Sequence, residues 1–274
     1  MAIPPDSEPR PPRIPGNVSL FPGAPESPVI LHVPHSARRI PPSVRADIVL
    51  DDPALELELD HITDAHTAEL SAAAADRARL RPWRFVNALS RLVVDPERFP
   101  DEREQMRAVG MGAVYTRTTG RDVLRPDSFD PTGLLDRYFH PYAHAMTELV
   151  ADRLRATGRA IIVDVHSYPT KPLAYELFAA GSRPPICLGT NDFHTPPELT
   201  ALATALFAGF GGVAVDTPFA GTYVPLDHYR SEPRVTALMV EIRRDGYMTE
   251  PGGPAGPGLP RLATALAALI DAAG

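Results

Sequence analysis

The stretch Ala160 to Val165 reads A-I-I-V-D-V and is followed at once by His166. It is mostly apolar and β-branched, a pattern typical of a strand buried on both faces of a sheet. A second such run, P-V-I-L-H-V from Pro28 to Val33, leads into His35. A serine follows each of the two histidines. We therefore expect two buried strands that each end in a His-Ser pair.

Four helical segments are predicted around these strands. In the first, apolar residues recur at three- and four-residue steps and the second half is rich in alanine, which favours one long helix. The second opens with Pro131 and closes before Gly158, as helices commonly do. The predicted helices cover residues 53–80, 131–157 and 197–210, and the end of the chain from 261.

Strands and helices alternate along most of the chain. Further strands are predicted over 83–95, with a break near Asn87, and over 212–216 and 237–242. This alternation indicates an α/β fold, a three-layer α/β/α sandwich on a mostly parallel, mixed sheet. Residues 1–27 are proline-rich and aperiodic, so we expect a weakly ordered arm followed by a single domain over 28–274. Residues 96–130 form a long polar loop, and such loops are more often functional than idle.

Composition limits the partners that the chain could have. The 34 acidic residues exceed the 27 basic ones, which gives a net charge of −7 and argues against binding to nucleic acid. Cys187 is the only cysteine, so any metal must be held by His, Asp or Glu. No apolar run approaches the roughly 18 residues of a membrane span, and the first residues lack a signal-peptide pattern. We expect a cytoplasmic protein that does not contact membranes.

The two predicted strand ends suggest a metal site. In an open α/β sheet ligands bind at the carboxyl ends of the strands, so His35 and His166 should converge on one crevice. A hydrolytic zinc site normally needs a third protein ligand. Asp60 and Asp64 are four residues apart on the predicted helix and would share a face, so either could ligate while the other orients. The alternative is that the histidines only bond locally and the aspartates face solvent.

Glu241 is an acid within A-L-M-V-E-I-R, a stretch that otherwise resembles a buried strand. Burying a carboxylate without a partner is costly, so a cation, a metal-bound water or a substrate is expected beside it. A general base is the functional interpretation. The alternative is an edge strand in which Glu241 faces solvent and pairs with Arg243 or Arg244.

Arginines around the 90–98 segment suggest an acidic substrate. Arg91 and Asp95 lie on the same side of a predicted strand, with Arg98 close behind, and a guanidinium is the preferred partner of a carboxylate. Surface salt bridges are the alternative. His140 and His144 form an i, i+4 pair that could support the site or contact substrate. Glycine-rich phosphate motifs and a G-x-S-x-G elbow are absent, which argues against nucleotide binding and a serine hydrolase.

Seven stretches, taken in order, resemble the N-formylglutamate amidohydrolase family over about residues 29–248. The family is similar in turn to zinc carboxypeptidases. The stretches are V-P-H-S at 33–36, D-x-x-x-D at 60–64, S-R-L-V-V-D-P-E-R at 90–98, Y-F-H-P-Y-A-H at 138–144, D-V-H-S at 164–167, T-P-F-A-G-T-Y at 217–223 and V-E-I-R-R-D-G-Y-M at 240–248.

The resemblance implies a phosphorylase/hydrolase-like fold, one catalytic zinc per chain and hydrolysis of an amide next to a carboxylate. Its implied metal ligands are His35, His166 and either Asp60 or Asp64. Glu241 would be the general base. The substrate-binding residues implied are Arg91, Arg98, His144, Gly221 and Tyr223.

The chain departs from the family pattern at three places beside the expected pocket. Ala37 replaces the glycine after V-P-H-S, Glu97 replaces the asparagine of D-x-N-R, and Thr222 replaces the second glycine of P-F-x-G-G-Y. The resemblance therefore supports the fold and the zinc chemistry of this chain better than it supports the identity of the substrate. The expected partner is a small acidic N-acyl amino acid such as N-formylglutamate. The alternatives are a zinc amidase or exopeptidase for another substrate, and a metal-free protein that binds an acidic metabolite. The sequence leaves the oligomeric state open.

Overall fold

The computed structural model describes residues 16–177 and 181–274. Within them the chain forms a seven-stranded sheet in the order β1-β3-β2-β4-β7-β5-β6. The first fifteen residues of the predicted arm lie outside this description. The strands are β1 (Val18–Phe21), β2 (Val29–Val33), β3 (Trp83–Asn87), β4 (Ala160–Tyr168), β5 (Ile186–Gly189), β6 (Val213–Val215) and β7 (Val235–Arg243).

The central strands of the sheet run parallel. β2 pairs with β3 on one side and β4 on the other, and β4 pairs with β7 over its whole length, all in parallel. The antiparallel pairings lie outside this centre, between β1 and β3 and between β5 and β7, while β6 runs parallel to β5. The predicted α/β class with a mostly parallel, mixed sheet is confirmed. Because β2, β4 and β7 are neighbours, their carboxyl ends meet at one edge.

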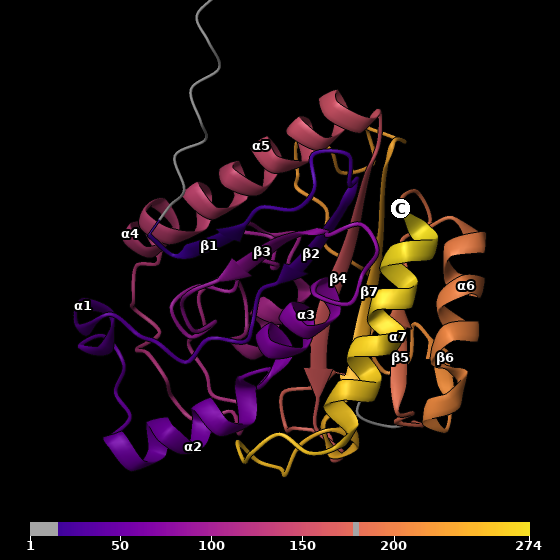
Figure 1. Ribbon diagram of the computed structural model, residues 1–274. Helices are drawn as coiled ribbons and strands as arrows, with labels where there is room; N and C mark the ends of the chain where they lie inside the picture. The colour runs from indigo at the N-terminus through magenta and orange to yellow at the C-terminus, as the bar shows by residue number, and fades with distance from the viewer. Residues whose placement is uncertain (1–15, 178–180) are drawn as a thin grey trace, which may run out of the picture.

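Helices cover both faces of the sheet, which makes three layers. The helices are α1 (Pro42–Arg45), α2 (Asp52–Ile62), α3 (Thr67–Ala75), α4 (Thr132–Leu134), α5 (His140–Thr157), α6 (Pro197–Phe207) and α7 (Gly258–Ala273). Figure 1 shows α3, α7 and α6 side by side in front of the strands, where their apolar residues form one core with β2, β4, β5 and β7. On the other face α5 packs against β2, β3, β4 and β7 in a second core.

The predicted helix over 53–80 is wrong in two respects, because the structure divides it into α2 and α3, and α3 already ends at Ala75. α2 ends at Ile62, and its C-cap Thr63 has an extended backbone. His66 then adopts a left-handed conformation with φ of 65° before α3 begins. The backbone N–H of Asp64 donates to the carbonyl oxygen of His35 at 3.0 Å. The helix therefore ends where this segment bonds to the chain beyond β2.

Three strand assignments also need correction. Residues 18–21, expected to belong to the arm, form β1 at the sheet edge, and β5 was not expected at all. Both are four residues long, too short for a clear alternating pattern. The predicted break near Asn87 is present, because β3 ends there and the Asn87 side chain accepts a hydrogen bond from the N–H of Leu89, but no strand follows over 88–95. Arg91 and Asp95 therefore lie in a turn and loop rather than on a strand.

None of the helices in the described ranges combines the length and the apolar character needed to cross a membrane.

Candidate metal and active site

Two histidines come together at the carboxyl edge of the sheet. His166 belongs to β4, and His35 lies two residues beyond the end of β2, the strand that pairs with β4 in parallel. Both side chains are buried, and their Nδ1 atoms are 3.2 Å apart. The convergence predicted from the two strand ends is thus present, and it follows from the adjacency of β2 and β4.

Asp64 joins these histidines, whereas Asp60 does not. The Oδ2 atom of Asp64 lies 3.1 Å from Nδ1 of His166 and 3.6 Å from Nδ1 of His35. The side chain of Asp60 is 33% exposed and forms an ion pair with Arg38 at 2.6 Å. The expectation that both aspartates share one helix face is wrong, because α2 ends at Ile62 and Asp64 lies beyond it.

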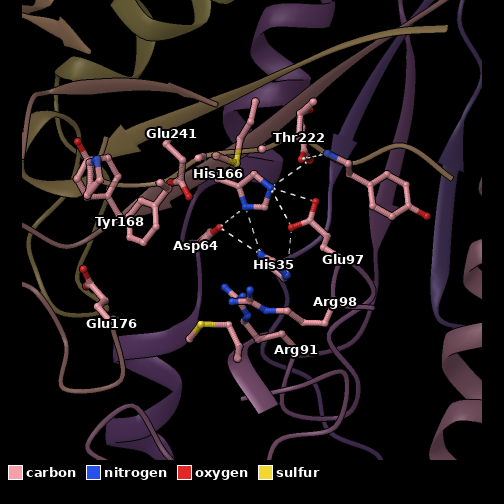
Figure 2. Close-up of a pocket in the computed structure, with 18 of the residues that line it drawn as sticks. His35, Asp64, Arg91, Glu97, Arg98, His166, Tyr168, Glu176, Thr222 and Glu241 are labelled. Atoms are coloured by element: carbon pink, nitrogen blue, oxygen red, sulfur yellow. Dashed lines mark hydrogen bonds and ion pairs between the residues drawn. The ribbon is translucent and has the colours of Figure 1, made fainter. Parts of the chain in front are cut away.

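The Nε2 atoms of the same rings are held by other carboxylates. His35 Nε2 is 2.9 Å from Asp95, and His166 Nε2 is 3.1 Å from both Asp164 and Glu97. Figure 2 shows Glu97 on the opposite side of His166 from Asp64. Metal-binding histidines usually donate their second ring N–H to such a carboxylate, which fixes the tautomer and leaves the other nitrogen free for a metal. The Nδ1 atoms are therefore the ones presented for binding.

The charges of this cluster favour a cation between the rings and Asp64. Burial acts to lower the pKa of His166, but the charges of Glu97 and Asp164 outweigh it and raise that pKa well above the usual value. Burial acts to raise the pKa of Asp64, yet hydrogen bonds from His166 and His35 hold it below the usual range. Acidic groups therefore surround both rings, and a metal ion bound at the Nδ1 atoms would supply compensating positive charge.

The donor set fits zinc. Bond lengths of about 2.0–2.2 Å in a tetrahedral site place the ligand atoms about 3.4 Å apart. The separations of 3.1, 3.2 and 3.6 Å among the two Nδ1 atoms and Asp64 Oδ2 lie around this value. Glu97 also forms a group with His35 and His166 whose ligand atoms are close enough for a metal. Three protein ligands leave a fourth position for water or substrate, as in hydrolytic zinc sites.

Glu241 lies beside this group on β7. It is paired with His166 across the β4–β7 register and with Cys187 across β5. Its Oε2 atom is buried, and no hydrogen-bond partner for it is found within the described ranges. Burial raises the pKa of Glu241 to about 7. The solvent-facing alternative, with Glu241 on an edge strand, is wrong, because β7 lies between β4 and β5. A buried carboxyl of this kind is suited to exchange protons near neutral pH.

Two arginines lie below the histidines in Figure 2. The guanidinium of Arg91 has hydrogen-bond partners within the protein. Its Nη2 donates to Asp95 at 2.7 Å and its Nε donates to Tyr115 at 2.9 Å. Arg98 has weaker partners, at 3.5 Å on Asp95 and 3.7 Å on Glu104. Its guanidinium is thus the more available of the two for a ligand carboxylate.

Of the other residues predicted to contact substrate, two line the cavity of the site and one is exposed on the surface. Gly221 and Tyr223 line the cavity together with the site residues. Gly221 has a φ of 90°, which favours glycine, and Tyr223 donates its backbone N–H to Asp164 at 3.2 Å. His144 is exposed on α5 and does not line this cavity. The expectation that His144 contacts substrate is therefore wrong, because the helix turns it outward while Tyr142 faces the core.

The cavity has a volume of about 830 Å³. Its wall includes the histidines, Asp64, Glu241 and Arg98, and it continues past Tyr168 and Phe219 to a buried ion pair between Glu176 and Arg183. This exceeds the space that a formylated amino acid needs. The arrangement can place an acyl group beside the donor atoms and a carboxylate beside the arginines.

Several residues of the site have no role in the predictions from sequence. Asp164 and Glu97 lie within the quoted motifs without a predicted role. Arg244 is predicted only as a surface partner of Glu241, yet its Nη2 donates to Asp64 at 3.1 Å. His32 is predicted only as part of a buried strand. Its polar side chain in an otherwise apolar run was the signal that could have identified it.

Comparisons with known proteins identify a family to which this chain is similar. The sequence model of the family described as N-formylglutamate amidohydrolase matches residues 27–248. An N-formylglutamate deformylase from Pseudomonas aeruginosa is 27% identical over 234 residues, which are 81% of this chain and 83% of that protein.

Two solved structures share the fold. An N-formylglutamate amidohydrolase from Ralstonia eutropha superposes with a TM-score of 0.76 at 22% identity, covering 94% of this chain and 96% of that one. A gene product from Agrobacterium tumefaciens gives a TM-score of 0.63 at 16% identity, covering 94% of each chain. The family match spans most of the chain and includes every residue of the site. The protein therefore belongs to the N-formylglutamate amidohydrolase family.

Proposed function

We propose that this protein is a zinc-dependent hydrolase of N-formyl or other N-acyl acidic amino acids, with N-formylglutamate as the first candidate substrate. The observation that supports it most is the meeting of two Nδ1 atoms and Asp64 Oδ2 at ligand-like distances beside an unpartnered buried glutamate. The names of the relatives point to the same substrate. The cytoplasmic location expected from the sequence stays a prediction.

His35, Asp64 and His166 would hold the zinc ion. Zinc at such a site supplies two effects, a polarised carbonyl and a bound water whose pKa falls toward about 7. The protein holds the ligands in place through Asp95 and Asp164, which orient the two imidazole rings. These contacts would fix the tautomer and the orientation of each ring toward the metal.

Glu241 would handle the proton. Its buried Oε2 accepts a proton from the attacking water, and the same carboxyl then returns it to the leaving amine nitrogen. A pKa of about 7 suits both roles, because the group is partly ionised and partly protonated at neutral pH. Its position on β7 beside His166 puts the base next to the ligand set.

Arg98 would bind the carboxylate of the substrate. Its long ion pairs leave its N–H groups available for a bidentate contact. Arg91 would act mainly by holding Asp95 and Tyr115, although it also lines the cavity. Fixing the substrate in this way lowers the entropic part of the barrier.

Zinc reconstitution followed by a substrate panel tests the proposal. Metal-free protein would be titrated with Zn²⁺ and assayed on N-formylglutamate, N-formylaspartate, N-acetylglutamate and short peptides. We expect zinc-dependent release of formate that is lost in Asp64→Asn. Rapid turnover without any bound metal, or no hydrolysis of any acyl amino acid, would contradict it.

The cavity volume of about 830 Å³ favours a second candidate, an amidase or exopeptidase for a larger acyl group. Preference for the longer acyl or peptide substrates in the same panel would support it. A metal-free binding protein would show no stoichiometric zinc and no hydrolysis. The panel and the zinc titration together separate the three functions.

A further inference from the structure

A second group of potential metal ligands lies behind His166, on the side of its Nε2 atom. His32 Nδ1 is 2.8 Å from Asp164 Oδ1 and 3.5 Å from Glu97 Oε1. One ligand atom from each of these three residues lies within 4.8 Å of the other two. His32 and Asp164 are fully buried, and Glu97 faces the cavity. The proposed function gives none of the three a metal.

The two carboxylates of this group have only histidines as ion-pair partners within the described ranges. Asp164 pairs with His32 and His166, and Glu97 pairs with those two and His35. Neither carboxylate forms an ion pair with an arginine or lysine of the described ranges, so a divalent cation would balance their charge. The inference rests on the proposed function, which leaves these three residues without a metal.

We propose that His32, Glu97 and Asp164 bind a second divalent cation. One neutral imidazole and two carboxylates balance the charge of such an ion, so the buried cluster becomes neutral. One ligand atom of each residue lies close enough to the other two for the three to share one metal ion. Nitrogen and oxygen donors of this kind bind zinc and manganese.

Tyr142 prepares His32 for this role. Its hydroxyl oxygen lies 2.6 Å from Nε2 of His32. When Nε2 carries the proton and donates it to Tyr142, the Nδ1 lone pair points into the cluster. Glu97 is also one of the positions at which the chain departs from the family pattern.

Zinc stoichiometry tests this proposal. Metal-free protein would be saturated with Zn²⁺, desalted and analysed for metal by mass spectrometry. We expect about two equivalents in the unaltered protein and about one in Glu97→Gln or His32→Asn, each of which keeps a similar shape but removes a ligand. His140→Ala and Glu102→Gln change exposed residues of the same types and should keep about two. Circular dichroism would verify that each variant is folded.

His35→Ala separates this proposal from the proposed function. It should remove one equivalent and leave the one that depends on Glu97 and His32. If the unaltered protein binds one equivalent that His35→Ala removes and Glu97→Gln does not, the second site is wrong and the catalytic site stands. If that one equivalent depends on Glu97 and His32 but not on His35, the second site stands and the catalytic assignment is wrong. Two equivalents in Glu97→Gln would also overturn the second site.

Discussion

Two pairs of histidines in this protein show opposite relations between sequence and space. His35 and His166 are 131 residues apart, yet their Nδ1 atoms are 3.2 Å apart and buried. His140 and His144 are four residues apart on α5, and both are exposed. The first pair meets because parallel strands β2 and β4 are neighbours in the sheet. Helical spacing places residues on one face, but it does not determine whether that face is buried.

Asp60 and Asp64 show the same contrast within five residues. Asp60 is on α2 and pairs with Arg38 near the surface. Asp64 follows the helix end and reaches the histidines. Their i, i+4 spacing suggested a shared role, but the end of the helix separates them. Contacts made by strand ends and loops therefore build the site, and helical pairs lie outside it.

The sharpest test of this contrast compares the two histidine pairs. His35→Ala or His166→Ala should each remove the catalytic zinc and abolish hydrolysis, because two protein ligands are too few for a stable site. His140→Ala and His144→Ala should keep both, because their side chains are exposed on α5. Metal analysis and a formate-release assay on all four variants would measure this. Zinc loss in the helical variants would reverse the comparison.

Glu241→Gln separates chemistry from metal binding at the same sheet edge. Glutamine keeps the size of the side chain but cannot accept the proton, so kcat should fall by roughly 10² to 10⁴ while zinc stays bound. The acid limb of the pH profile, where activity rises as the carboxyl ionises near pH 7, should disappear with it. Steady-state kinetics between pH 5 and pH 9 would show both effects. Near-normal turnover would rule out Glu241 as the base.

Asp64→Asn and Asp60→Asn test the comparison between the two aspartates. Asp64→Asn should weaken zinc binding by more than roughly 10- to 100-fold, which is the cost of losing a residue that only hydrogen-bonds to a metal ligand. Asp60→Asn should leave zinc affinity unchanged, since its ion pair with Arg38 is partly exposed and worth at most about 1 kcal/mol. Competition with a fluorescent zinc chelator gives both affinities. Equal losses would show that the two residues act together after all.

Arg98→Ala should have a smaller effect that depends on the substrate. Loss of one charge-assisted contact should cost about 1.5–3 kcal/mol in kcat/KM on N-formylglutamate. The cost should shrink on a substrate whose matching carboxylate is an amide. Arg137→Ala, which changes an exposed arginine, is the control. An equal loss on acidic and amidated substrates would mean that Arg98 does not bind the carboxylate.

The smallest effect concerns Glu58, a buried residue of α2 that bonds Thr119 rather than the site. Burial raises its pKa from 4.5 to about 7, so the folded state holds its proton more tightly than the unfolded state. The free energy of unfolding should therefore decrease as pH rises from about 4.5 to 7, by on the order of 1–3 kcal/mol. Glu58→Gln should remove this decrease. Urea unfolding at several pH values would check it, and an unchanged pH dependence would contradict it.

Much of the fold could be predicted from local patterns. The long buried strands β4 and β7 are mostly apolar runs, and Gly158 ends α5 with a φ of 80° as its position indicates. The short strands β1 and β5 could not be predicted, because four residues carry little pattern and their stability comes from pairing with neighbours. The division of α2 from α3 was missed for a related reason. The hydrogen bond from Asp64 to His35 that accompanies it is a tertiary contact.

The sequence by itself determined the chemical types present at the site and that His35 and His166 follow buried strands. Only the tertiary structure decided which ring nitrogen faces which carboxylate, that Asp64 rather than Asp60 reaches the histidines, and that Glu97, Asp164 and His32 gather behind His166. The reason is physical. The apolar pattern of a short segment indicates which of its residues are buried, because burial follows the apolar character of neighbouring residues. The meeting of single atoms depends on sheet order, helix ends and loop paths, which arise from contacts between distant parts of the chain.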